Sequence, residues 1–112
     1  MPSFAVRCVY FFGIKPNGLN VFEERVVAFE VRTREEAYKR ADAESDAYAS
    51  AHGYVPFPEI SCYDLDDNSA VDGAEVWSAL YEDSCSLVEF YAKRYSSVEY
   101  HAADVRPPSC PR

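Results

Sequence analysis

The segment DLDDNSAVDGAE, from Asp64 to Glu75, carries the densest set of potential metal ligands in the chain. In the calcium loop of an EF-hand, carboxylate and amide oxygens recur at fixed offsets, and a glutamate closes the loop as a bidentate ligand. The residues at those offsets here are Asp64, Asp66, Asn68, Asp72 and Glu75. Calcium binding is therefore the first chemistry to consider.

The residues around this loop argue against an EF-hand, which needs a helix on each side. Pro56 and Pro58 break any helix that would enter the loop. The segment Glu75–Tyr81, which leaves it, is β-branched and aromatic. The position that needs glycine for a sharp turn is Ser69. We therefore expect an acidic loop that joins two strands, and we assign no metal ion or other cofactor to the chain.

A second group of charges, Glu23, Glu24 and Arg25, interrupts an apolar segment. Phe22 and Val26 share one parity of the expected strand, whereas the next apolar residues fall on the other parity. A β-bulge near these charges would reconcile the two halves by shifting the register one residue. The pattern predicts three solvated charges beside a bulge, and a functional carboxylate pair is the alternative.

Aromatic and acidic residues also alternate in the last third of the chain. Tyrosine and tryptophan are enriched at protein interfaces, because each has a large apolar body and a polar tip. Packing of the tyrosines around the core is the competing interpretation. The residues assigned to a candidate interface are Trp77, Tyr81, Glu82, Asp83, Tyr91 and Glu99.

Composition limits the choice of partner. The chain has 112 residues and a formal net charge of −8. An acidic chain repels nucleic-acid phosphates and suits a basic protein surface. No apolar run approaches the ~20 residues of a membrane span. The N-terminal segment resembles a first strand rather than a signal peptide, so a cytoplasmic location is expected.

The cysteines and histidines do not form a recognisable catalytic or zinc motif. Cys8, Cys62 and Cys85 lie in apolar patterns and are expected to be reduced thiols in the core. Cys110 lies in a Pro-rich tail, and a Cys85–His101 nucleophile pair would need a proximity that spacing alone does not provide. No Gly-rich phosphate loop is present. We therefore expect a protein that is not an enzyme.

Periodicity predicts one α+β domain over residues 1–105, followed by the tail 106–112. The expected strands are Phe4–Phe12, Leu19–Val31, Glu59–Leu65 and Glu75–Tyr81. A helix should begin at the N-cap Thr33 and end at Gly53, and a shorter one should follow Ser84 or Ser86. The order β-β-α-β-β-α predicts two hairpins, which form an antiparallel four-stranded sheet with helices packed on one face.

Two segments, VFEERVVAFEVRTREEAYKRADAES and EVWSALYED, resemble the bacterial family called domain of unknown function 4288. The resemblance extends roughly from Phe4 to Tyr95. It implies a bacterial α+β domain, brings no established activity and transfers no catalytic residue. The loop that begins at Asp64 is not part of the pattern.

Two functional hypotheses follow. The first is a small acidic, non-catalytic interaction protein of the inhibitor or immunity type, which covers a basic surface of its partner. The second is a small-molecule or metal-binding domain, or an enzyme, that uses Glu23, Glu24 and the segment Asp64–Glu75. The oligomeric state stays open.

Overall fold

In the computed structural model, residues 2–65 and 71–95 are described, and they form an α+β fold with one antiparallel sheet and two helices. The elements are β1 (Ser3–Ile14), β2 (Asn20–Glu30), α1 (Arg34–His52), β3 (Val55–Pro56), β4 (Ser61–Leu65), β5 (Glu75–Asp83) and α2 (Leu87–Arg94). The predicted α+β class is therefore confirmed.

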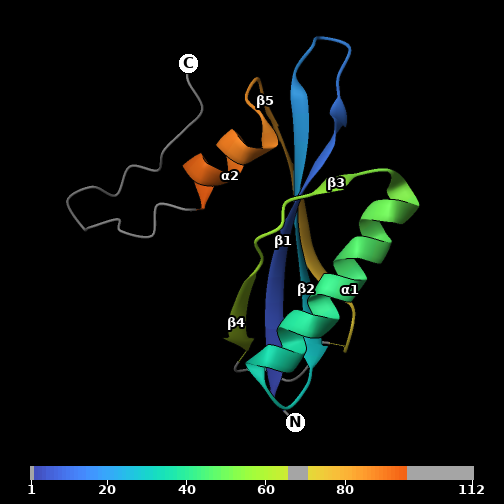
Figure 1. Cartoon of the computed structure of the whole chain (residues 1–112), viewed down its shortest axis with the longest axis vertical. Coiled ribbons are helices and arrows are strands. Elements are labelled where there is room, and N and C mark those ends of the chain that lie inside the picture. The colour runs from blue at the N-terminus through green and yellow to red at the C-terminus, as the bar shows by residue number, and fades with distance from the viewer. Residues whose placement is uncertain (1, 66–70, 96–112) are drawn as a thin grey trace, which may run out of the picture.

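The hairpin of β1 and β2 forms the centre of the sheet (Figure 1). Its turn is closed by a hydrogen bond from the Gly18 amide to the Lys15 carbonyl, and Gly18 has φ +87°. A side chain at this φ would be strained, which explains the Asn17-Gly18 pair that marks the turn in the sequence. The predicted first hairpin is confirmed.

The predicted second hairpin is wrong, and the sheet has five strands rather than four. β4 pairs with β1, and β5 pairs with β2 on the other edge of the sheet. The short β3, which is not among the four expected strands, also pairs with β1. The segment between Asp64 and Glu75 does join two strands, as predicted, but these strands are not neighbours. A turn-rich sequence shows that the chain reverses direction and does not show which strand it joins next.

The two helices pack on opposite faces of the sheet, so the expectation that both cover one face is also wrong. Val6 and Val27 are direct partners in the hairpin and lie in one core cluster with Ala41 of α1. Val9 and Phe22 lie in the other cluster, with residues of α2. The reason is visible in β1, which is apolar at both parities and therefore needs cover on both sides.

Both helices begin at the predicted capping boxes. The Thr33 hydroxyl accepts a hydrogen bond from the Glu36 amide, and Ser86 and Glu89 repeat the arrangement in α2. Gly53 ends α1 with φ +74°. The residues of α1 that are buried against the sheet are all small, and they recur every fourth position: Ala37, Ala41, Ser45 and Ala49.

Candidate functional site

The three consecutive charges of β2 are buried. Glu23, Glu24 and Arg25 are 7%, 6% and 8% exposed. The predicted bulge is not at this place, because β1 and β2 stay in register from Phe22 to Glu30. The register shifts instead at Phe12 of β1 and, between β2 and β5, near Val76. The apolar pattern of β2 is therefore interrupted because charged side chains occupy core positions, and the expectation of solvated charges is wrong.

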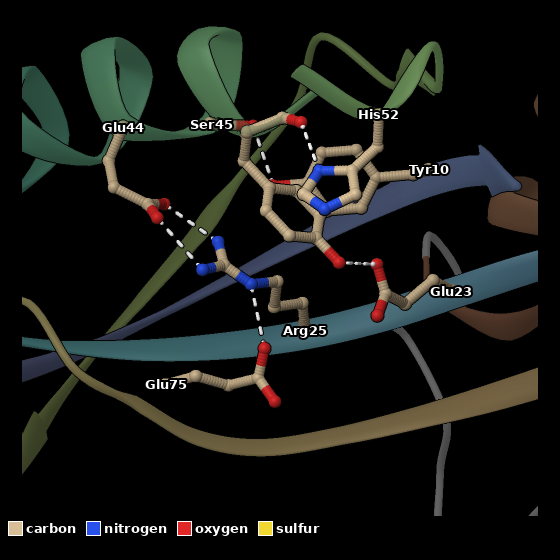
Figure 2. A network of polar contacts seen from close by, with 8 residues as sticks. Tyr10, Glu23, Arg25, Glu44, Ser45, His52 and Glu75 are labelled. Carbon is tan, nitrogen blue, oxygen red and sulfur yellow. Dashed lines mark hydrogen bonds and ion pairs between the residues drawn. The ribbon is translucent and has the colours of Figure 1, made fainter. Parts of the chain in front are cut away.

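Arg25 lies at the centre of a charge network between the sheet and α1 (Figure 2). Its two terminal nitrogens each donate to a carboxylate oxygen of Glu44 at 2.8 Å. Its Nε donates to Glu75 of β5, also at 2.8 Å. The guanidinium carbon lies 3.8 Å from the ring centroid of Tyr48. Bidentate pairing and stacking are the two interactions for which arginine is suited best.

Glu23 occupies the same face and accepts a hydrogen bond from the Tyr48 hydroxyl at 2.7 Å (Figure 2). Burial raises the pKa of the Glu23 carboxyl above its usual 4.5, and the Tyr48 hydrogen bond opposes that shift. Burial is the largest cause that raises the pKa of Tyr48, and the hydrogen bond to the Glu23 carboxylate raises it further. The hydroxyls of Tyr10 and Ser45 lie 2.8 Å apart in the same layer, and burial raises the pKa of Tyr10.

Glu24 points to the opposite face, under α2. It accepts a hydrogen bond from the Tyr81 hydroxyl at 3.1 Å, and its nearest oxygen lies 3.9 Å from Nε of Arg7. Arg94 of α2 donates to the same Tyr81 oxygen at 2.7 Å. Burial raises the pKa of Tyr81 and of Tyr95, and the Glu24 charge adds to both shifts. The three residues Glu23, Glu24 and Arg25 are thus divided between two separate networks by strand alternation.

These networks join elements of the fold to one another. In the described part of the chain, each buried carboxylate of β2 accepts a hydrogen bond from a tyrosine, and Glu24 also forms an ion pair with Arg7. A carboxylate that already accepts from a phenol or a guanidinium has fewer lone pairs for a substrate. The arrangement fits a structural role, in which buried polar contacts hold α1 and β5 against the central hairpin and a hydrogen bond joins α2 to β5.

Three of the five candidate calcium ligands lie among the described residues, and each is paired with a different arginine. Asp64 pairs with Arg34 at 2.9 Å, Asp72 with Arg40 at 2.7 Å, and Glu75 with Arg25. The hydrogen bond from the Glu30 amide is the largest cause that lowers the pKa of Asp72, and the hydrogen bond from Arg40 is the second. Asp66 and Asn68 lie outside the described residues. Over residues 2–65 and 71–95, no three side chains of histidine, cysteine, aspartate or glutamate are grouped as a metal site would require.

The cysteines follow the prediction in part. Cys8 and Cys62 are buried free thiols, and burial raises the pKa of both. Cys85 is also buried, in the cluster beneath α2, as its apolar pattern predicted. Cys110 and His101 lie outside the described residues.

The predicted aromatic and acidic interface is not one surface. Tyr91 is 5% exposed and stacks on Phe57 with ring centroids 3.9 Å apart, so it belongs to the core. Tyr81 turns its hydroxyl toward Glu24. Trp77 is 48% exposed, whereas Glu82 lies at the opposite parity of β5 and pairs with Lys15. Asp83 is at the parity of Trp77 and accepts from the Ser84 amide, and Glu99 lies outside the described residues.

The residues that remain available to a partner gather along β5. This strand pairs with β2 on one side, and the described residues place no strand on its other side. Val76, Trp77 and Leu80 are 47%, 48% and 54% exposed. The sequence pattern predicted that this segment is half of a hairpin. Its apolar residues at both parities were the available sign that something other than α1 must cover it.

Comparisons with models of known families, with curated proteins and with solved structures find no match to the chain. The resemblance to domain of unknown function 4288 therefore stays a prediction. No helix within residues 2–65 and 71–95 is long and apolar enough to span a membrane.

Proposed function

We propose that the protein is a non-catalytic interaction domain that binds a basic protein through β5, in the manner of an inhibitor or immunity protein. The single observation that supports this proposal best is the apolar edge strand, in which Val76, Trp77 and Leu80 are about half exposed. Trp77 lies on the α2 face of the sheet and Leu80 on the α1 face, and large exposed apolar side chains along an edge strand are typical of binding sites.

Charge supports the choice of a basic partner. The chain carries a formal net charge of −8, and β5 contains Glu75, Glu82 and Asp83 with no lysine or arginine. Glu82 pairs with Lys15, but both side chains are more than 40% exposed, and such surface pairs are worth little. A partner cation can therefore replace Lys15 at small cost. Acidic fields of this kind accelerate the encounter with a basic surface.

A small-molecule or metal site receives less support. It would rely on Glu23, Glu24 and the segment Asp64–Glu75. The carboxylates of this set that the structure describes already bond to arginine or tyrosine.

Site-specific crosslinking tests the proposal. A benzophenone amino acid replaces Ser78 of β5, and in a matched control it replaces Lys39, which is exposed on α1. In cells that make the protein, we expect a crosslinked basic protein from the first position only. The adduct should disappear in the double variant Trp77→Ser and Leu80→Ser and persist in Val88→Ser, which alters an exposed apolar residue of α2. Equal adducts from positions 78 and 39, or an adduct indifferent to the double variant, would show that β5 is not the binding surface.

A further inference from the structure

After the register shift near Val76, the outer edge of β5 from Trp77 to Tyr81 has no further feature that protects edge strands. The strand is nine residues long, and its sequence, EVWSALYED, contains no proline and no basic residue. Natural edge strands are usually short, bent away, or interrupted by lysine or proline, because free backbone amides and carbonyls recruit further strands. Over residues 2–65 and 71–95, no such partner lies beside β5. Its backbone is therefore a second recognition feature besides its side chains.

Two hydrogen bonds just before β5 identify which backbone groups of the strand point outward. The Ala28 amide donates to the Ala74 carbonyl, and the Gly73 amide donates to the Ala28 carbonyl. Ala28 thus bonds toward β5, and because bonding direction alternates along a strand, so do the other even-numbered residues of β2. Their partners in β5 include Trp77, Ala79 and Tyr81. The residues between these partners, Ser78 and Leu80, direct their amides and carbonyls away from the sheet.

We propose that an extended basic segment of the partner adds to this edge as a further strand, bonded to the backbone of Ser78 and Leu80. This inference rests on the proposed function and specifies its mode of recognition. Side chains of the added strand would alternate. Those beside Trp77 and Tyr81 would be apolar. Those on the other face, where Leu80 and Glu82 lie, would be lysine or arginine, whose aliphatic stems cover Leu80 and whose charge meets Glu82.

A second copy of the chain fits this edge less well. If two antiparallel copies of β5 overlapped over their full length, Glu75 of one copy would lie opposite Asp83 of the other at both ends. Like charges directly opposite each other destabilise a strand pair. Each copy also carries a formal net charge of −8. Charge complementarity therefore favours a basic segment over self-association.

A model peptide tests strand addition directly. The probe is a capped peptide of alternating lysine and valine, about as long as β5. Trp77 is the only tryptophan of the chain and lies on the strand in question, so its fluorescence reports on cover of β5. We expect saturable binding that shifts the tryptophan emission to the blue. The affinity should fall as the salt concentration rises. The same peptide should not bind when N-methyl groups block every second amide, namely the amides that would donate to β5. A peptide with glutamate in place of lysine should not bind either.

Variants of the protein separate the inference from the proposed function. Ser78→Pro removes an outward amide, and we expect it to weaken peptide binding about tenfold, the equivalent of one lost hydrogen bond. Ser78→Ala, the matched control, should bind as the wild type does. The N-methylated peptide provides the same test on the unaltered protein if the proline variant does not fold.

Three results would overturn the inference. If N-methylation and Ser78→Pro leave the affinity unchanged while Trp77→Ser abolishes binding, side chains alone hold the partner, and the proposed function survives without strand addition. If the lysine–valine peptide does not bind at all while the cellular adduct at position 78 forms, strand addition is again excluded and the proposed function survives. A concentration-dependent dimer in sedimentation velocity that is lost in Ser78→Pro would assign the edge to a second copy.

Discussion

The most informative perturbation of the buried network is Arg25→Met, which keeps the approximate length of the side chain and removes its charge. The Arg25 side chain is 9% exposed and makes three hydrogen bonds to carboxylates, two to Glu44 and one to Glu75. Its loss also removes a positive charge that favours the ionised form of Glu23. Breaking a buried ion pair from one side costs roughly 3–5 kcal/mol, since the remaining charge stays desolvated.

The exposure of the partners sets the expected value within that range. The Glu44 and Glu75 side chains are 29% and 40% exposed, so both can regain water when the guanidinium is lost. We therefore expect a loss near the lower limit, about 3 kcal/mol of unfolding free energy. Glu75→Gln, which retains an acceptor for Nε of Arg25 at an exposed position, should cost less than about 1 kcal/mol.

Urea unfolding at neutral pH, followed by circular dichroism, measures these differences. A double variant that adds Glu44→Leu to Arg25→Met should recover part of the lost stability, because it removes the orphaned carboxylate. If Arg25→Met lies within about 1 kcal/mol of the wild type, the network does not hold α1 and β5 to the sheet, and our account of its structural role is wrong.

Three further predictions address single residues and the acidic loop. Burial raises the pKa of Glu23 in the folded protein above the 4.5 of the unfolded chain. The free energy that protonated Glu23 contributes to stability is therefore fully present below pH 4.5 and is lost as the pH rises through the folded pKa. Glu23→Gln should therefore raise the melting temperature at neutral pH and change it little at about pH 4; a fall at neutral pH would contradict this sign. Tyr91→Ala should cost ~3–5 kcal/mol in urea unfolding, as truncation of a core aromatic does, whereas a surface position would lose almost none. Calcium at about 1 mM should leave the melting temperature nearly unchanged, because Asp72 is already paired with Arg40; a shift of several degrees would revive the calcium site.

Local features of the structure were predictable because their causes lie within a few residues of one another. The Asn17-Gly18 turn needs a glycine that can adopt a positive φ. The capping box of Thr33 and Glu36 closes over three residues. The left-handed end of α1 depends on Gly53 alone. In each case, the residues that cause the structure also form it.

The order and pairing of the strands in the sheet depended on contacts that sequence periodicity cannot specify. β4 could have paired with β5, which follows it in the chain, and it joins β1 instead. Both parities of β1 are apolar, so each face needs a cover, but the pattern does not say that α1 takes one face and α2 the other. Packing over the whole chain decides between arrangements that satisfy the same local pattern.

The candidate site shows the same division most clearly. Residue types predicted that Glu23, Glu24 and Arg25 carry charge, and charge alone favoured solvent. They are buried because their partners arrive from distant segments: Glu44 lies 19 residues from Arg25, Glu75 lies 50, and Tyr81 lies 57 residues from Glu24. A buried charge is tolerated only when it is paired, and only the folded chain brings these pairs together. For the same reason, the sequence could mark Trp77 as a candidate interface residue, but only the tertiary structure showed that Trp77 and Leu80 lie exposed on an edge strand.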